Sequence, residues 1–236
     1  MWERGAELTL PPAPNLEGCM IVLGFDPSLT NFGWAVHDST AKGPKRCLDR
    51  GRFKTDAKMV FVDRYIYLRE CVSDLIRKVN PDRCGQESPV FGELYSEGLY
   101  GLYLYTMEAV RNSKKDIILF SPLQVKLHAR ESLKRPTGWK MDKPDMVEAA
   151  KKDTETKKTW NHNEADAYLV ARLAGRFWDF YSGVLDPPSL TKAEVPLFTK
   201  EHTFVRGKRA GKTVRSGLLF REDDRFFLWS NQLTTE

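Results

Sequence analysis

Residues 20–36 read MIVLGFDPSLTNFGWAV, and this stretch decides which kind of sheet the chain can form. The first six residues are nearly all apolar, which is typical of a strand that is buried on both faces. Asp26 and Pro27 end the run, because proline cannot continue a central strand. Residues 31–36 can return as the second strand of a hairpin, and residues 50–55 as a third. Asp26 is therefore expected at the end of a buried strand.

Helical and strand patterns alternate beyond this hairpin. Apolar residues at three- and four-residue spacing predict helices over residues 61–79, 94–111, 144–153 and 161–182, and Pro122 opens a shorter one that contains Lys126. Further short strands are expected over residues 83–86, 116–120, 203–208, 212–220 and 225–229. The order predicts an α/β fold in which helices flank a mixed sheet, with a small C-terminal β appendage. We expect an N-terminal arm over 1–19, a core over 20–184 and a basic β-hairpin extension over 185–236.

The composition narrows the class of protein. The chain has 236 residues and is 41% hydrophobic, which is enough for one sizeable core. No apolar run approaches the roughly 18–20 residues that a membrane span needs, and the two glutamates in the first ten residues argue against a secretory signal. The four cysteines stand far apart without a CxxC pair. This spacing excludes a thiolate zinc cluster and favours a reducing, cytoplasmic location.

Basic residues are concentrated in two tracts, although the formal net charge is only +5. Residues 111–158 contain 13 basic and seven acidic side chains, and residues 206–221 contain six basic and no acidic ones. Such tracts suggest a surface that meets phosphate groups. The alternative is that they are ordinary solvated faces.

Three acids fall where predicted elements begin or end, namely Asp26, Glu87 and Asp166. Carboxylates that converge from separate elements are the oxygen ligands that a hard divalent cation requires. Two such ions can activate a water on one side of a phosphodiester and stabilise the leaving oxygen on the other. The spacing alone does not establish such a site, because the chain has 32 acidic residues.

Three separate segments resemble the RuvC branch of the ribonuclease H-like superfamily, in a divergent form of the kind that a phage encodes. They are IVLGFDPSLTNFGWAV (21–36), SPLQVKLHARESLKRPTGWKMDKPDMVEAAKK (121–152) and NHNEADAYLVARLAG (161–175). Together they cover roughly residues 20–182. The resemblance implies a ribonuclease H-like fold and an endonuclease that resolves four-way (Holliday) DNA junctions. It also implies a homodimer that uses two Mg²⁺ ions, with Mn²⁺ as a substitute, in the cytoplasm of the cell or of a phage's host.

The resemblance assigns roles to individual residues. Asp26, Glu87 and Asp166 would hold the metal ions, and Lys126 would lie near the scissile phosphate. The family commonly has another ligand at the position of Asn163, for which the neighbours His162 and Glu164 are substitutes, and Glu93 or Glu97 could compete with Glu87. The predicted DNA contacts are Lys126, Lys140, Lys143, Arg206, Lys208, Arg209, Lys212 and Arg215.

Two other functions remain open from the sequence. The chain could be another ribonuclease H-like nuclease, acting on other branched DNA or RNA–DNA hybrid or as a transposase domain. It could instead be an inactive module that only binds DNA structure, since asparagine is a weaker ligand than a carboxylate. Four tyrosines are expected in the core and at a dimer surface, and one or two of them could stack on an exposed base: Tyr95, Tyr100, Tyr103 and Tyr105.

Overall fold

The computed structural model describes residues 20–89, 97–199, 201–203, 213–215, 220–222 and 225–227. A five-stranded sheet lies at its centre, with the strand order β3-β2-β1-β4-β5. The strands are β1 (Ile21–Asp26), β2 (Asn31–Asp38), β3 (Cys47–Lys54), β4 (Arg83–Glu87) and β5 (Asp116–Phe120). β2 runs antiparallel to β1 and β3, whereas β4 and β5 run parallel to β1 and to each other. The predicted mixed sheet is confirmed.

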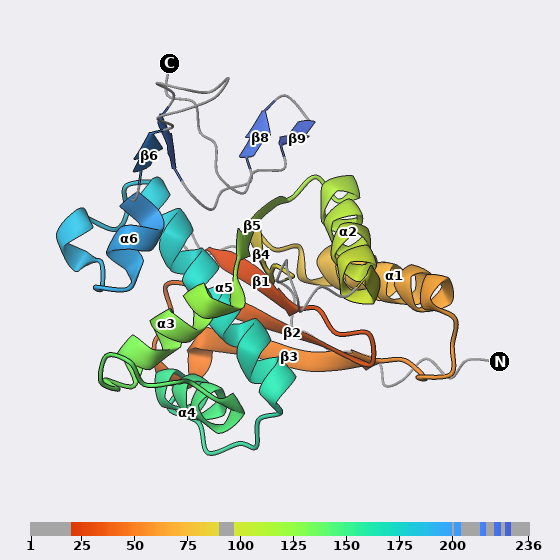
Figure 1. Ribbon diagram of the computed structural model, residues 1–236, viewed down its shortest axis with the longest axis horizontal. Coiled ribbons are helices and arrows are strands. Elements are labelled where there is room, and N and C mark those ends of the chain that lie inside the picture. Colours follow the sequence, from red (N-terminus) through yellow and green to blue (C-terminus); the bar gives the residue numbers. More distant parts are fainter. Residues whose placement is uncertain are drawn as a thin grey trace.

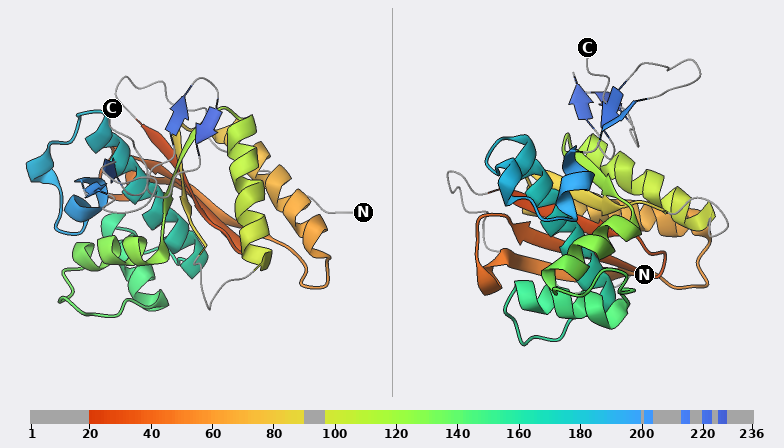
Figure 2. Two further views of the ribbon diagram at one scale, coloured as in Figure 1. Left: turned by 45° about the horizontal axis from the view of Figure 1, so that its top comes forward. Right: turned by 60° about the vertical axis from the view of Figure 1, so that its left-hand side comes forward.

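Helices cover both faces of this sheet (Figure 1). They are α1 (Phe61–Val79), α2 (Glu97–Asn112), α3 (Pro122–Ser132), α4 (Lys143–Asp153), α5 (His162–Tyr181) and α6 (Glu194–Thr199). Figure 2 shows α1 and α2 on one side of the sheet and α3, α4 and α5 on the other. None of these helices, which lie in the described part of the chain, has the length and apolarity needed to cross a membrane.

Alternate side chains of β1 belong to two separate hydrophobic clusters, one on each face of the sheet. Leu23 and Phe25 pack in the cluster with α1 and α2, whereas Val22 packs in the cluster with α3, α4 and α5. Successive side chains of a strand point to opposite faces, so the apolar run of β1 supplies both cores. This is why β1 has no polar residue before Asp26.

α5 approaches the sheet unusually closely because glycines and alanines line the contact. A Cβ on Gly24 of β1 would lie 2.2 Å from the carbonyl oxygen of Ala167, and a Cβ on Gly85 of β4 would lie 2.8 Å from the Cβ of Ala174. Both distances are too short for real atoms, so larger side chains at these positions would push the helix away. The small residues therefore fix the height of α5 above β1 and β4.

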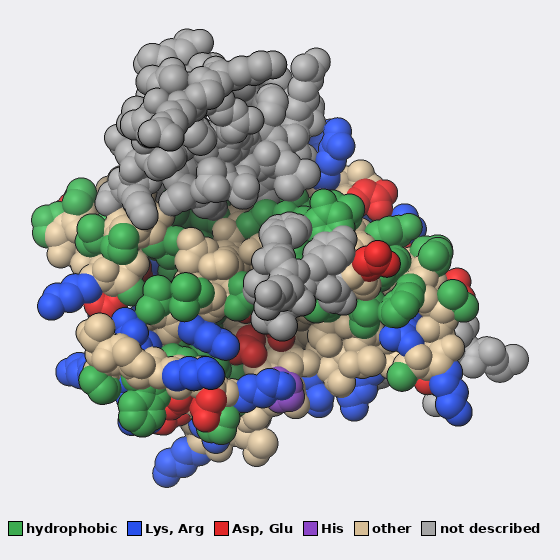
Figure 3. Space-filling model, in the orientation of Figure 1, with side chains coloured by type: hydrophobic (Ala, Val, Ile, Leu, Met, Phe, Trp, Pro, Cys, Tyr) green, Lys and Arg blue, Asp and Glu red, His purple; other side chains and the backbone are tan. Residues whose placement is uncertain are grey.

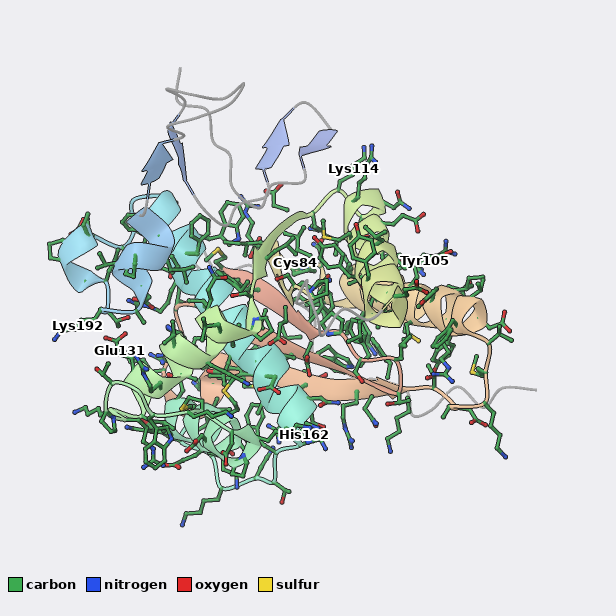
Figure 4. All side chains as sticks on the ribbon, viewed as in Figure 1. Cys84, Tyr105, Lys114, Glu131, His162 and Lys192 are labelled. Carbon is green, nitrogen blue, oxygen red and sulfur yellow. The ribbon has the colours of Figure 1, made fainter. Side chains whose placement is uncertain are left out.

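The segment after α5 begins with contacts to the core. Glu194 and Phe198 of α6 are buried, and Phe198 belongs to the α5-side cluster. The Glu194 carboxylate forms an ion pair with Arg176 of α5 and lies 3.2 Å from His128 Nδ1 of α3. Glu131 at the end of α3 accepts hydrogen bonds from the backbone N–H groups of Lys192 and Ala193, at 2.8 and 2.7 Å (Figure 4). The first part of the predicted extension thus packs on the core.

Several predicted boundaries differ from the structure. β3 begins at Cys47 instead of residue 50, and a short 3₁₀ turn (Gly43–Arg46) leads into it. Four short strands form two antiparallel pairs: β6 (Glu201–Thr203) with β7 (Thr213–Arg215), and β8 (Phe220–Glu222) with β9 (Arg225–Phe227). The predicted strand over 203–208 meets a described strand only at residue 203. The predicted arm over 1–19 lies outside the described residues.

Candidate active site

Asp26 and Glu87 are the last residues of two neighbouring parallel strands. In the register of β1 with β4, Phe25 lies opposite Gln86, so the next residue on each strand is one of these two acids. Both acids are two residues beyond a glycine that faces α5, so strand alternation places them on that same face. Asp166 immediately precedes Ala167, the residue of α5 that lies over Gly24. Three separate elements thus bring their carboxylates to one edge of the sheet.

Burial and neighbouring charges raise the pKa values of all three carboxylates. Burial, followed by the negative charges of Glu87 and Asp166, raises the pKa of Asp26 well above its ordinary value. Burial and the charge of Asp166 raise the pKa of Glu87 to about 7. Burial also raises the pKa of Asp166 to about 6. Like charges that share a partly buried site disfavour ionisation, and a cation placed among them relieves this repulsion.

Two lysines oppose this negative charge. Lys126 on α3 lowers the pKa values of Glu87 and Asp166, and Lys143 on α4 lowers those of Asp26 and Asp166. Both side chains are exposed. Figure 3 shows acidic side chains in a hollow of this face, with Lys and Arg side chains beside them. The arrangement places a half-buried negative centre next to positive charges that are open to solvent.

Helix capping explains why Lys143 stands where it does. Asp142 is the N-cap of α4, and its side chain accepts a hydrogen bond of 3.0 Å from the backbone N–H of Asp145. Pro144 follows at the start of the helix, where its missing N–H costs nothing. Lys143 is consequently held at the first turn of α4. α4 in turn packs against α5, which carries Asp166.

The three candidates for a fourth ligand have separate contacts. The Asn163 amide donates a hydrogen bond to the Asn31 carbonyl oxygen. Glu164 forms ion pairs with Arg50 and Arg52 of β3, at 3.1 and 3.4 Å. His162, at the first position of α5 (Figure 4), has its Nε2 3.4 Å from Nζ of Lys143.

These contacts show which part of the molecule each candidate side chain faces. Glu164 is engaged by β3, and none of the three raises or lowers the pKa of Asp26, Glu87 or Asp166. His162 has a lowered pKa because of burial and of the charges of Lys143 and Arg52. His162 therefore lies among the basic side chains of Lys143 and Arg52.

The donor chemistry of the site fits a hard divalent cation. All three acids offer oxygen ligands, and Oδ1 of Asp166 is buried without a hydrogen-bond partner. Among the described residues, however, no group of three or more His, Cys, Asp or Glu side chains is arranged so that it could hold a metal ion as it stands. The carboxylates fit a cation in chemistry and charge, and side-chain rotation would be needed to complete a ligand set.

The remaining predicted residues fall into two groups. Glu97 is exposed at the start of α2 and is not among the charges that shift the pKa of Asp26 or Asp166, whereas Glu93 lies outside the described residues. Lys140 is exposed in the loop before α4. Of the DNA contacts predicted in the extension, Arg206, Lys208, Arg209 and Lys212 lie outside the described residues, whereas the backbone of Arg215 belongs to β7.

Arg50 and Arg52 were not predicted as part of the site's surroundings. They stand two residues apart on β3, so they share one face of that strand. Arg50 also lies over the ring of Trp160, with its guanidinium carbon 3.7 Å from the ring centroid. The alternation of arginines in residues 50–53 is the signal that could have indicated a charged face directed at α5.

Comparison with known proteins gives relatives of one kind, although no protein-family model matches the chain. The crossover junction endodeoxyribonuclease RuvC of Halothermothrix orenii is 30% identical over 113 residues, which are 45% of this chain and 66% of that protein. RuvC of Erythrobacter litoralis is 38% identical over 68 residues, 28% of this chain and 40% of that protein. The matched parts therefore span from two fifths to just under two thirds of these relatives.

Solved structures agree with this comparison at the level of the fold. The structure of Thermus thermophilus RuvC superposes with a TM-score of 0.56 at 18% identity and covers 70% of this chain and 97% of that chain. The same protein in complex with a Holliday junction substrate superposes with a TM-score of 0.52 at 17% identity, covering 70% of this chain and 96% of that chain. The five-stranded sheet and its helices are therefore a RuvC-type, ribonuclease H-like fold.

Proposed function

We propose that this chain, which is a RuvC-like protein of the ribonuclease H-like superfamily, is a metal-dependent endonuclease that resolves four-way DNA junctions. One observation carries the proposal: Asp26, Glu87 and Asp166 converge from β1, β4 and α5, and the charge of Asp166 raises the pKa values of both Asp26 and Glu87. Structural carboxylates rarely cluster in this way without a cation, because each addition increases the repulsion. The sequence relatives named RuvC support the same reaction class.

Each charged group has a role in this proposal. Asp26, Glu87 and Asp166 would hold two Mg²⁺ ions, or Mn²⁺ in their place, with Asn163 as the further ligand and His162 or Glu164 as its substitutes. Ions bound there would activate a water for in-line attack and stabilise the leaving oxygen. Lys126 and Lys143 would neutralise the phosphate being cut and position it over the carboxylates. Burial of the carboxylates strengthens these interactions, since charges act over a lower dielectric there.

Branched DNA is the proposed substrate. The surface near the carboxylates carries the exposed lysines Lys126, Lys140 and Lys143, which are suited to phosphate contacts. The basic extension, with Arg206, Lys208, Arg209, Lys212 and Arg215, would add backbone contacts. One of the solved structures of similar fold holds a Holliday junction substrate. Such a nuclease would act where the DNA is, in the cytoplasm of a bacterium or of a phage's host.

A homodimer is part of the proposal because a four-way junction has two equivalent strands to cut. Apolar side chains stay exposed at the start of α1: Val60 (68%), Phe61 (54%), Val62 (53%) and Ile66 (38%). Leu99 and Leu104 of the neighbouring helix α2 are also exposed, at 36% and 39%. An apolar strip of this kind on paired helices fits a second copy of the chain.

Cleavage of a synthetic four-way junction tests the proposal. The full chain is incubated with the junction, with linear duplex of the same sequence and with RNA–DNA hybrid, in Mg²⁺ or in EDTA. We expect paired symmetric nicks in the junction alone, abolished by EDTA and by Asp26→Asn. Asp74→Asn is the matched control, because Asp74 is an exposed acid on α1 that forms an ion pair with Arg77 of the same helix.

Two other outcomes of this experiment would change the proposal. Cleavage of the hybrid instead of the junction would keep the metal site and reassign the substrate. Tight junction binding without cleavage in either Mg²⁺ or Mn²⁺ would overturn the enzyme assignment and leave a module that binds DNA structure.

A further inference from the structure

One tryptophan beside the candidate active site is exposed. Trp139 lies in the loop between α3 and α4 and is 45% exposed, whereas the other tryptophans in the described part of the chain are at most 7% exposed. The loop joins two helices that pack against each other and against α5 (Figure 1). A large apolar ring in this position needs a reason, because burying it elsewhere would be favourable.

The ring is held firmly although it is exposed. Its Nε1–H donates a hydrogen bond of 2.9 Å to Oδ2 of Asp145, and its backbone N–H donates one of 3.1 Å to the Pro136 carbonyl oxygen. The Arg135 guanidinium carbon lies 5.1 Å from the ring centroid, within the range of a cation–π contact. Asp145 is itself buried and belongs to the capping box of α4. These contacts fix the plane of the ring at the entrance to α4.

Arg135 and Asp145, the two side chains that contact the Trp139 ring, are themselves fixed by further contacts. Arg135 contacts Asp145 at 3.4 Å and Glu148 at 2.8 Å. The hydrogen bond from Trp139 is the main reason why the pKa of Asp145 lies below its ordinary value. The indole, the guanidinium and the carboxylate therefore form one closed set of contacts.

Trp139 lies near Lys143 in the chain, and the charge of Lys143 acts on the carboxylates. Lys143, whose charge acts on both Asp26 and Asp166, stands two residues before Asp145 on the same helix. Trp139 and Lys143 are four positions apart in the sequence, so their Cα atoms lie within about 15 Å of each other. This is the span of a few nucleotides of a DNA strand. A DNA strand with its phosphate at Lys143 would therefore pass within reach of the ring.

The surroundings favour a nucleobase over an apolar protein partner. Lys134 and Lys140 are exposed on either side of the ring in sequence, and Arg135 lies over it. A flat aromatic side chain among cations is the arrangement that proteins use to stack single-stranded bases while holding the backbone. Bases inside an intact duplex are not available for such stacking, whereas bases at a branch point are.

We propose that Trp139 stacks on a nucleobase that is unpaired at the branch point of bound DNA, and that this contact favours branched over linear DNA. The inference rests on the proposed function and names a specificity-determining residue within it. Lys126 and Lys143 would then hold any DNA backbone, and Trp139 would add affinity only where a base is free to leave the stack.

Binding measurements on the full chain test this role. Kd values for a four-way junction and for linear duplex are measured in Ca²⁺, for wild type, Trp139→Ala, Trp139→Leu and Trp139→Phe. We expect Trp139→Ala and Trp139→Leu to weaken junction binding by about 5- to 100-fold, from the usual energy of base–aromatic stacking, and to change duplex binding by less than about twofold. Trp139→Phe should retain most of the junction affinity.

A fluorescence measurement and a control variant make the test specific for stacking by the Trp139 ring. A 2-aminopurine base at the branch point should lose fluorescence on binding wild type and not on binding Trp139→Leu, which keeps an apolar side chain but has no ring. Val184→Ala is the matched control, because Val184 is 77% exposed and lies just beyond the C-terminal end of α5. It should change none of these values.

The experiment distinguishes failure of the stacking role from failure of the proposed function. Equal junction binding by wild type and Trp139→Ala, or an equal loss for junction and duplex, would overturn the stacking role. So would a change in oligomeric state with unchanged Kd, which would make the ring a protein contact. If wild type neither binds nor cuts any of the DNAs, the proposed function itself fails.

Discussion

Gly24 of β1 and Ala167 of α5 are in contact so close that no side chain fits between them: a Cβ on Gly24 would lie 2.2 Å from the Ala167 carbonyl oxygen. Asp26 stands two residues after this glycine and Asp166 one residue before this alanine. The separation of the two carboxylates is therefore set by a backbone contact rather than by long side chains. The geometry of the candidate site therefore depends on Gly24 and Ala167, whose side chains cannot themselves bind a metal ion or a substrate.

Gly24→Ala should disable the site and destabilise the fold. The added methyl group must displace α5, because backbone atoms of Ala167 and Ala171 cannot move independently of the helix. Overpacking of this kind costs about 1–3 kcal/mol or more. We expect a lower midpoint in urea unfolding and loss of most junction cleavage. Gly183→Ala is the control: it is strained by its positive φ of 76° but meets no atom within 4 Å, so it should lose about 1 kcal/mol and keep cleavage.

Asp26→Asn should stabilise the metal-free protein. The amide removes the carboxylate of Asp26, whose ionised form is disfavoured by burial and by the charges of Glu87 and Asp166. We expect the free energy of unfolding in EDTA to rise by about 1 kcal/mol, as is common when a functional site is neutralised. Mg²⁺ should raise the Tm of wild type and have a much smaller effect on the variant. Thermal unfolding of both proteins, with Asp74→Asn alongside, checks this, and equal Mg²⁺ shifts in all three would contradict it.

His37 should make stability fall in acid. This side chain is buried under α5, and its Nδ1–H donates to the Arg46 carbonyl oxygen at 3.1 Å. Burial, with smaller contributions from Arg172 and Arg46, lowers its pKa from 6.5 to about 4. Between these values the unfolded chain binds more protons than the folded one, so this contribution is full above about pH 6.5 and is lost as the pH falls to about 4.

The size of that loss is about 3 kcal/mol, from the difference between the two pKa values. Urea unfolding of wild type and His37→Gln between pH 4 and pH 7 measures it. The variant should be less stable at pH 7, where it loses packing, and its stability should depend less on pH. Parallel pH profiles for the two proteins would show that His37 is not responsible.

Ile66→Glu should separate the proposed dimer. Ile66 is exposed on α1 beside the apolar residues that we assign to the contact with a second copy, and a charge buried there would lack a partner. We expect sedimentation of the wild type as a dimer and of the variant as a monomer. The monomer should nick junctions singly, without paired cuts. Val184→Glu introduces the same charge at an exposed site elsewhere and should leave the dimer intact.

The central part of the fold could be predicted from the sequence, and so could the three acids. Two local patterns indicated these acids: an apolar run that ends at Asp26-Pro27, and a helix with alanines on either side of Asp166. The first pattern is clear because both faces of β1 are buried, so that strand must be apolar throughout. The start of β3 could not be found, since its residues are mostly half-buried and carry no alternating pattern. The engagement of Glu164 by Arg50 and Arg52 also escaped prediction, because it joins residues more than a hundred positions apart.

The buried ion pair of Glu194 has a practical consequence for anyone who shortens this protein. The predicted boundary between core and extension at residue 185 would suggest truncation there, yet that truncation would leave the Arg176 guanidinium without its partner and remove Phe198 from the interior. Removing one partner of a buried pair costs about 3–5 kcal/mol, a large share of the stability of an ordinary domain. Crystallisation or fusion work should therefore keep the chain through α6 and place any tag or junction beyond it.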